Sequence, residues 1–219
     1  MHKQFYEGVR TKDLIDALKP KLILEMGFGA GTNMLVLLTY TKKPGADYRI
    51  ISLSDDFNVE RMTLPNDFID RFIFVKGISY AMVPRWNELG LPPPYNEKID
   101  FCIIDTDHNY WTLQKELEYL DSIMADKCAI ALHDTATKPC EHHLMYENAL
   151  DKSSNSMMRT TRENLTKDVY PFDEVAATLD VPMMQAIDEF LGTHSDYKKI
   201  KHFDECCGCT VLGRDFDYE

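Results

Sequence analysis

The segment Leu22–Asn33, LILEMGFGAGTN, decides the fold. It opens on an apolar run that predicts a buried strand over residues 21–25. Three glycines follow at positions 27, 29 and 31, and they predict a sharp turn in which the backbone can approach a ligand closely. The apolar spacing of residues 32–40 predicts a helix packed against that strand. A strand, a glycine-rich turn and a helix in this order make the first half of a βαβ unit.

The same alternation of short apolar runs and helical patterns continues along most of the chain. Further buried strands are predicted over residues 49–53, 72–75, 99–104 and 128–132, and helices over 11–19, 59–71, 112–124 and 183–191. Two last runs, 199–203 and 209–213, predict an antiparallel hairpin at one edge. Continuous apolar strands between helices are typical of a parallel sheet that is covered on both faces. We therefore expect a Rossmann-like, doubly wound α/β fold, with a mostly parallel seven-stranded sheet and an antiparallel C-terminal edge hairpin.

The bulk properties indicate one soluble domain. The 219 residues suit a single domain, which we expect to span residues 1–219. The polar stretch 138–171 predicts an inserted, lid-like segment rather than core. The formal net charge of -12 argues against nucleic acid and membrane surfaces as partners. Cys206, Cys207 and Cys209 lack the paired spacing of a zinc site, and the first residues lack a secretory signal. We therefore expect a reduced, cytoplasmic protein, and the sequence leaves a homo-oligomer open.

Ionisable side chains collect where the predicted parallel strands end. Asp55–Asp56 follow the second strand, Asp105–His108 follow the fourth, and His133–Asp134 end the fifth. Ligands of open parallel sheets bind outside the carboxyl ends of the strands, where the strand order reverses. Folding alone does not explain these polar strand ends, so we expect a ligand site along this edge of the sheet.

The first turn differs from a dinucleotide-binding turn in spacing and in charge. Its pattern is Glu-x-Gly-x-Gly-x-Gly, whereas dinucleotide turns usually read Gly-x-Gly-x-x-Gly. The carboxylate of Glu25 would repel a pyrophosphate, and it suits a ligand that carries an ammonium or sulfonium group. Asp55 is placed to accept hydrogen bonds from both hydroxyls of a ribose. A plain strand–helix turn and a solvated helix cap are the alternatives for these two acids.

Taken together, these motifs resemble a known family. LILEMGFGAGTN resembles motif I of the class I S-adenosylmethionine-dependent methyltransferases. IDFCIIDTDHNYWTLQKELEYL, followed by AIALHDT, resembles the branch of antibiotic and sugar O-methyltransferases and cephalosporin-hydroxylase-like proteins. The resemblance covers about residues 22–135, with a weaker match in the final hairpin. It implies S-adenosylmethionine as the cofactor and O-methylation of a small hydroxylated acceptor as the reaction.

The resemblance also implies the residues of the cofactor site. The glycine turn would hold the methionine part of the cofactor, and Asp55 the ribose. Relatives often carry an acid after the third strand, whereas this chain has Ile78, so Ser79 or a backbone group must serve the adenine. The predicted cofactor-binding residues are Glu25, Gly27, Phe28, Gly29, Gly31, Asp55, Ser79 and Asp105.

A divalent metal is a further implication of the resemblance. Metal-dependent relatives bind Mg²⁺ with an acid after the fourth strand and two residues after the fifth, which here are Asp105, His133 and Asp134. Two carboxylates suit Mg²⁺, but imidazole suits transition metals better, so the prediction covers Mg²⁺, Mn²⁺, Fe²⁺ or no metal. The alternative for His133 and Asp134 is a hydrogen-bonded pair that only orients the loop.

His108 is the predicted catalytic base, with Asp105 and His133 as its catalytic partners. Methyl transfer to oxygen requires that the hydroxyl lose its proton, and histidine titrates near neutrality. Some metal-dependent sugar O-methyltransferases place a catalytic histidine at the matching position. The alternative for His108 is a helix cap, and Asp107 is expected to orient His108 or to cap the same helix. Two other functions stay open: a nicotinamide-dependent oxidoreductase on a similar fold, and a non-catalytic S-adenosylmethionine-binding protein.

Overall fold

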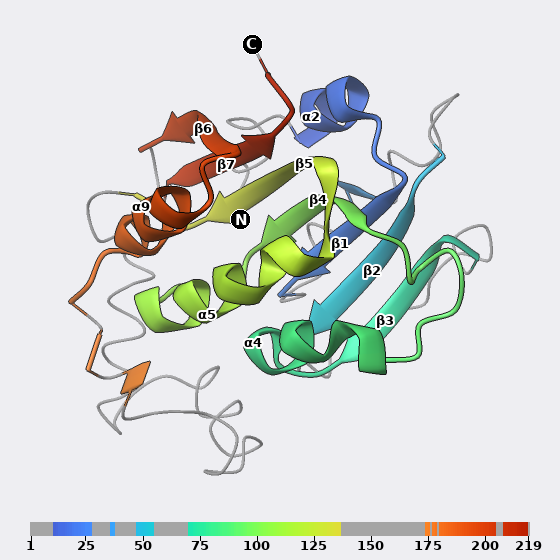
Figure 1. The fold of residues 1–219 in the computed structure, drawn as a ribbon, viewed down its shortest axis with the longest axis horizontal. Helices are drawn as coiled ribbons and strands as arrows, with labels where there is room; N and C mark the ends of the chain where they lie inside the picture. The colour runs from blue at the N-terminus through green and yellow to red at the C-terminus, as the bar shows by residue number, and fades with distance from the viewer. Residues whose placement is uncertain are drawn as a thin grey trace.

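A computed structural model describes residues 11–27, 36–37, 47–54, 70–136, 174–175, 177–178, 180–204 and 208–218. Its centre is a seven-stranded sheet in the order β3-β2-β1-β4-β5-β7-β6 (Figure 1). The strands are β1 (Leu22–Met26), β2 (Arg49–Ser54), β3 (Phe72–Lys76), β4 (Ile99–Ile104), β5 (Met124–His133), β6 (Tyr197–Phe203) and β7 (Cys209–Arg214). The described helices include α2 (Thr11–Leu18), α4 (Ser79–Met82), α5 (Tyr110–Leu120) and α9 (Met183–Thr193), with 3₁₀ turns at Val83–Glu88 and Asp121–Ile123. None of the helices described is long and apolar enough to cross a membrane.

The strand directions confirm the predicted fold class. β1 to β5 pair in parallel, so the arrowheads of β1, β2, β4 and β5 point to one edge of the sheet in Figure 1. β6 and β7 form the antiparallel hairpin, and β7 lies between β6 and β5. This is the expected Rossmann-like, doubly wound sheet with an antiparallel C-terminal edge.

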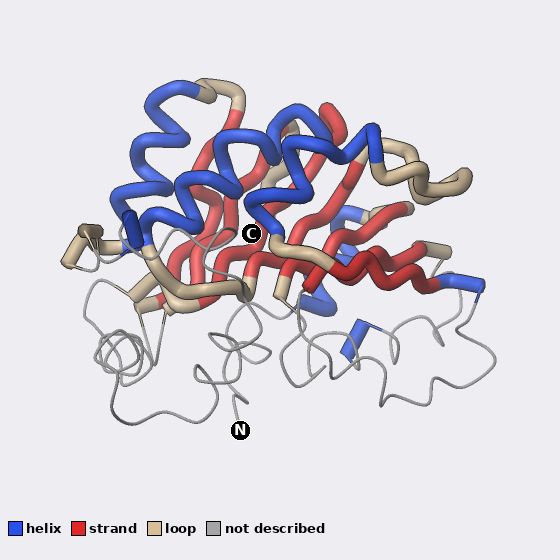
Figure 2. Tube along the Cα trace, turned by 90° about the horizontal axis from the view of Figure 1, so that it is seen from below, coloured by secondary structure: helices blue, strands red, loops and turns tan. Residues whose placement is uncertain are grey.

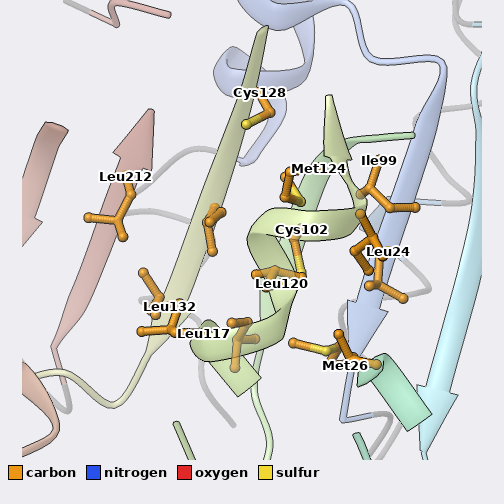
Figure 3. Close-up of a cluster of buried hydrophobic side chains, with 14 of the residues drawn as sticks. Leu24, Met26, Ile99, Cys102, Leu117, Leu120, Met124, Cys128, Leu132 and Leu212 are labelled. Atoms are coloured by element: carbon orange, nitrogen blue, oxygen red, sulfur yellow. The ribbon is translucent and has the colours of Figure 1, made fainter. Parts of the chain in front are cut away.

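Each face of the sheet buries its own apolar cluster, because the central strands are buried on both sides. Leu24 and Met26 lie in the cluster that α5 and α9 cover, together with Leu117 (Figure 3). Ile23 lies in the opposite cluster, which includes Leu14 of α2. Figure 2 shows the row of described helices along one side of the sheet. The result is a rigid platform whose loops at the carboxyl edge carry the ionisable residues.

The structure corrects several predicted boundaries. The helix predicted over 112–124 runs from Tyr110 to Leu120, and Asp121–Ile123 form a 3₁₀ turn. β5 begins at Met124 rather than at residue 128, because Ile99 pairs with Met124 and a register shift follows before Phe101. Ala125 and the polar residues Asp126 and Lys127 therefore belong to the strand, although no continuous apolar run marks them. Residues 79–88 form α4 and a 3₁₀ turn where no element was predicted. The helices predicted over 32–40 and 59–71 fall almost wholly outside the described residues, and the insert 138–171 falls entirely outside them.

Candidate active site

The carboxyl ends of the central strands meet where the strand order reverses. β1 pairs with β2 on one side and with β4 on the other. The backbone pairing continues past the strand ends: the Gly27 N–H donates to the Leu53 carbonyl at 3.0 Å, and the Asp105 N–H donates to the Met26 carbonyl at 2.9 Å. The residues that follow β1 and β4 are thereby held side by side, at the place where open α/β sheets bind ligands.

Gly27, directly after β1, must be glycine for two reasons. Its φ of 87° lies in the left-handed region that glycine adopts without steric cost. A Cβ at this position would also lie 2.0 Å from the carbonyl oxygen of Asp105, far inside a van der Waals contact. The first glycine of the turn therefore lets the end of β1 pack directly against the end of β4.

Glu25 lies within β1, and none of its surface is exposed. Its Oε2 accepts a hydrogen bond from the Ser52 hydroxyl at 2.6 Å, which ties the carboxylate to β2. Electrostatic interactions are stronger in such a buried place than in water. The predicted acid is therefore held inside the sheet, two residues before Gly27, and does not turn to solvent. The other predicted members of this part of the site, Phe28, Gly29, Gly31 and Asp55, lie outside the described residues.

Four ionisable side chains from the ends of β4 and β5 form one group, which we call the Asp–His cluster: Asp105, His108, His133 and Asp134. Asp105 Oδ1 lies 2.9 Å from His108 Nε2 and 2.9 Å from His133 Nδ1. Asp134 is fully buried; its Oδ1 lies 3.0 Å from His133 Nδ1, and its Oδ2 is in close contact with His108 Nδ1. The two imidazole rings meet edge to face, with centroids 5.6 Å apart. The structure thus brings together all the residues predicted as catalytic or metal-binding, while their roles stay predictions.

Two residues of the Asp–His cluster have a left-handed backbone. The φ angle is 45° at His108 and 57° at Asp134. Such conformations cost residues other than glycine about 1–3 kcal/mol each, and they concentrate at functional sites. The tight turns that follow β4 and β5 are what carry both side chains into the cluster.

The Asp–His cluster keeps its carboxylates ionised. Burial acts to raise the pKa of Asp105, but hydrogen bonds with His108 and His133 outweigh it and hold that pKa well below its usual range. Burial also acts to raise the pKa of Asp134. The hydrogen bond with His108 and the charges of both imidazoles outweigh burial, so the pKa of Asp134 is lowered as well. Two negative charges therefore face two imidazoles at the carboxyl edge of the sheet. This arrangement can bind a cation or take up a proton.

A buried glutamate, Glu116 of α5, adjoins the cluster and was not predicted as part of the site. Its Oε1 accepts a hydrogen bond from the Ser79 hydroxyl, and its Oε2 accepts one from the Thr106 hydroxyl at 3.1 Å. Burial raises its pKa to about 7 in spite of these bonds. The hydroxyl of Ser79, a residue predicted to serve the adenine, thus donates a hydrogen bond to Glu116. The signal for Glu116 in the sequence is its place on the buried stripe of the helix, between Leu113 and Leu117.

The start of α5 corrects the expected helix cap. The Asn109 Oδ1 accepts a hydrogen bond from the Thr112 N–H at 2.9 Å, so Asn109 caps the helix. Asp107 accepts a hydrogen bond from the Thr112 hydroxyl at 3.4 Å. Neither His108 nor Asp107 is the cap, and the carboxylates of Asp105 and Asp134 contact the His108 ring.

Comparison with protein families gives one match in the part of the chain that carries this site. A family model described as a methyltransferase domain matches residues 24–135, about half of the chain. The matched segment runs from β1 through the glycine turn to the end of the Asp–His cluster. A comparison with curated protein sequences finds no match.

Solved structures with the same fold include two methyltransferases and one protein with Mg and SAM. An O-methyltransferase from Bacillus cereus in complex with SAH is 14% identical, with a TM-score of 0.55, over 95% of this chain and 80% of that chain. The plantazolicin methyltransferase BpumL, with SAH and a desmethylPZN analog, is 10% identical, with a TM-score of 0.54, over 97% and 86%. A cmcI structure with Mg and SAM is 15% identical, with a TM-score of 0.52, over 97% and 72%. At these identities the likeness shows the fold.

Proposed function

The chain belongs to the methyltransferase domain family, and from that premise we propose that it transfers the methyl group of S-adenosylmethionine to an oxygen of a small hydroxylated acceptor. One observation carries the proposal: Gly27, the first glycine of the turn, packs directly on Asp105 of the Asp–His cluster. A methyl donor over the turn and an acceptor at the cluster would be adjacent. Alignment of the donor and the acceptor oxygen can supply much of the acceleration of such a reaction. Structural neighbours that hold SAH or SAM support this choice of cofactor.

The buried carboxylate of Glu25 favours a cationic cofactor. A sulfonium would be attracted to this charge, and the low local dielectric strengthens the attraction. The pyrophosphate of a nicotinamide cofactor would be repelled by it, which disfavours the oxidoreductase alternative. We propose that the residues holding the cofactor are Glu25, Gly27, Phe28, Gly29, Gly31, Asp55, Ser79 and Asp105.

On the acceptor side, we propose that the hydroxyl proton leaves through the Asp–His cluster. His108 is the candidate base, because its ring is held between the carboxylates of Asp105 and Asp134. Those carboxylates would stabilise the imidazolium that forms when the ring takes up a proton. The acceptor hydroxyl would take the place of Asp105 at His108 Nε2.

The wider setting of the reaction is also a proposal. We propose that residues 1–219 form one domain and that the insert 138–171 closes over the acceptor to exclude water. We also propose that the protein acts in a reducing cytoplasm, which the free thiols of Cys102, Cys128 and Cys209 support.

Calorimetry with SAH and with NAD tests the proposal. SAH should bind and NAD should not. Gly27→Ala should abolish SAH binding, because the added methyl would push the end of β1 away from Asp105. Gly192→Ala is the matched control, since a Cβ there would meet nothing within 4 Å, and it should bind SAH like the wild type. Binding of NAD without SAH, or unchanged SAH affinity in a folded Gly27→Ala variant, would contradict the proposal.

A further inference from the structure

Three donor atoms of the Asp–His cluster lie around one small volume. Asp105, His108 and His133 each offer one atom, and these atoms all lie within 4.8 Å of one another. Two of the separations are 2.9 Å, and both end on Asp105 Oδ1. The three residues come from the end of β4, the loop after it and the end of β5, so the fold itself assembles the set.

The separations match donors that share one metal ion. Nitrogen and oxygen donors bind such ions at about 2.0–2.2 Å, so two donors at a right angle lie about 3 Å apart. The observed 2.9 Å therefore needs little rearrangement. The imidazole side chains are 14% and 10% exposed and the Asp105 side chain 27%, which leaves an open side for water or an acceptor oxygen.

Mg²⁺, the ion that the family resemblance implies, does not fit this donor set. Mg²⁺ is bound by carboxylates, phosphates and water. Here two of the three donors are imidazoles, which suit Fe, Zn, Cu and Ni, and two histidines with one carboxylate form the facial set of non-haem iron sites. We propose that Asp105, His108 and His133 bind a divalent first-row transition-metal ion rather than Mg²⁺. The proposal rests on the proposed function for its purpose, since a metal ion beside an acceptor hydroxyl lowers the pKa of that hydroxyl.

Asp134 would support this site without binding the ion. It is fully buried, and its Oδ2 contacts Nδ1 of His108, the ring nitrogen that does not face Asp105. Metal-bound histidines almost always donate their other ring N–H to a carboxylate, a carbonyl or water, which fixes the tautomer. Asp134 would therefore keep the proton of His108 on Nδ1 and leave Nε2 able to bind a metal. This differs from the set predicted from the sequence, in which Asp134 was a ligand and His108 the base.

Two other arrangements compete with a metal site. Protonated imidazoles could balance the two carboxylates as a closed ion-pair network. Alternatively, His108 serves as the base. This excludes a role as metal ligand through the same atom, because a nitrogen bound to a cation has no lone pair left for a proton. Metal binding, measured apart from turnover, separates the metal site from both of these arrangements.

The test titrates the full chain, stripped with a chelator, with Co²⁺ and with Mg²⁺ in a calorimeter. One equivalent of Co²⁺ should bind, and Mg²⁺ should show no binding at concentrations at which Co²⁺ saturates. His108→Ala and His133→Ala should abolish Co²⁺ binding, and Asp134→Asn should weaken it about 10- to 100-fold. His194→Ala is the control, because His194 lies outside the cluster and stacks on Phe190 of α9; it should bind Co²⁺ like the wild type.

A gain-of-binding variant guards against variants that fail to fold. His133→Asp exchanges an imidazole for a carboxylate, so it should bind Mg²⁺ measurably and lose affinity for Co²⁺. Mg²⁺ binding to the wild type as tight as Co²⁺ binding, no binding of either ion, or Co²⁺ affinity unchanged in His108→Ala would each overturn the inference. SAH affinity is measured on the same samples. A stripped chain that binds SAH but no Co²⁺ refutes the metal site alone, whereas Co²⁺ binding without SAH binding refutes the proposed function.

Discussion

The protein should become less stable as the pH rises, because the buried carboxylic acid of Glu116 then loses its proton. Glu116 lies on α5 and is fully buried, and this burial raises its pKa from 4.5 to about 7. The coulombic effect of Asp107 raises this pKa further, whereas the Ser79 and Thr106 hydroxyls and His108 lower it. Because the folded state holds the proton more tightly than the unfolded state, its stabilising effect is complete below about pH 4.5 and is lost as the pH rises through about 7.

The size of the effect follows from the two pKa values. Each unit of difference corresponds to about 1.4 kcal/mol, so a pKa of about 7 against 4.5 costs about 3 kcal/mol at high pH. About 2.5 kcal/mol of this should appear between about pH 5 and about pH 8. In a domain of this size, that loss lowers the melting temperature by about 5–10 °C.

Glu116→Gln isolates this contribution, because a glutamine has nearly the same shape and no charge to desolvate. Thermal unfolding at several pH values, in the presence of a chelator, should show the wild type losing stability relative to Glu116→Gln as the pH rises. Glu118→Gln is the matched control on the same helix, because Glu118 is exposed and pairs only with Lys115 among the contacts described for it. If the wild-type and Glu116→Gln melting temperatures stay parallel from about pH 5 to about pH 8, the reasoning is refuted, and Glu116 reaches water in solution.

Two more predictions concern the buried acids on either side of the site. Ser52→Ala removes the hydroxyl that donates to Glu25 and should lower the free energy of unfolding by about 1–3 kcal/mol in urea denaturation; an unchanged value would show that Ser52 does not hold the carboxylate. Asp134→Asn should make the chain less sensitive to acid, because a lowered pKa stabilises the fold above the usual 3.8 and that stability is lost as the pH falls through the lowered value. Circular dichroism during acid titration with a chelator measures this, and equal acid sensitivity of the two proteins would contradict it.

The sheet was predictable because its strands are buried on both faces and therefore appear as continuous apolar runs. The continuous apolar pattern is lost where a strand extends beyond the core. Asp126 and Lys127 are exposed and polar, yet they extend β5 at the end remote from the site. The helical residues 79–88 were not predicted because Pro84 and Arg85 interrupt the apolar spacing. The segment is also short and irregular, since a 3₁₀ turn follows a single turn of α-helix.

The site was predictable to the level of which residues meet, but not of which atoms meet. A parallel sheet brings the ends of β4 and β5 together, so Asp105, His133 and Asp134 had to be neighbours. The contact of His108 with both acids depends on its left-handed φ of 45°, which no local pattern in DTDHNY signals. The distinction between a ligand and a supporting carboxylate depends on which ring nitrogen faces which oxygen, and this is a property of the turns alone.

The contact between Gly27 and Asp105 couples the two halves of the site. The backbone of Asp105 is held by the end of β1, through its bond to Met26 and its packing on Gly27. The side chain of the same residue lies 2.9 Å from both imidazoles, so a shift of its backbone would change both distances. A ligand that moves Gly27 would therefore also shift Asp105 of the Asp–His cluster. The two distances from Asp105 to the imidazoles thus depend on the end of β1, and a methyl donor bound beside Gly27 would act on an atom that we assign to the metal.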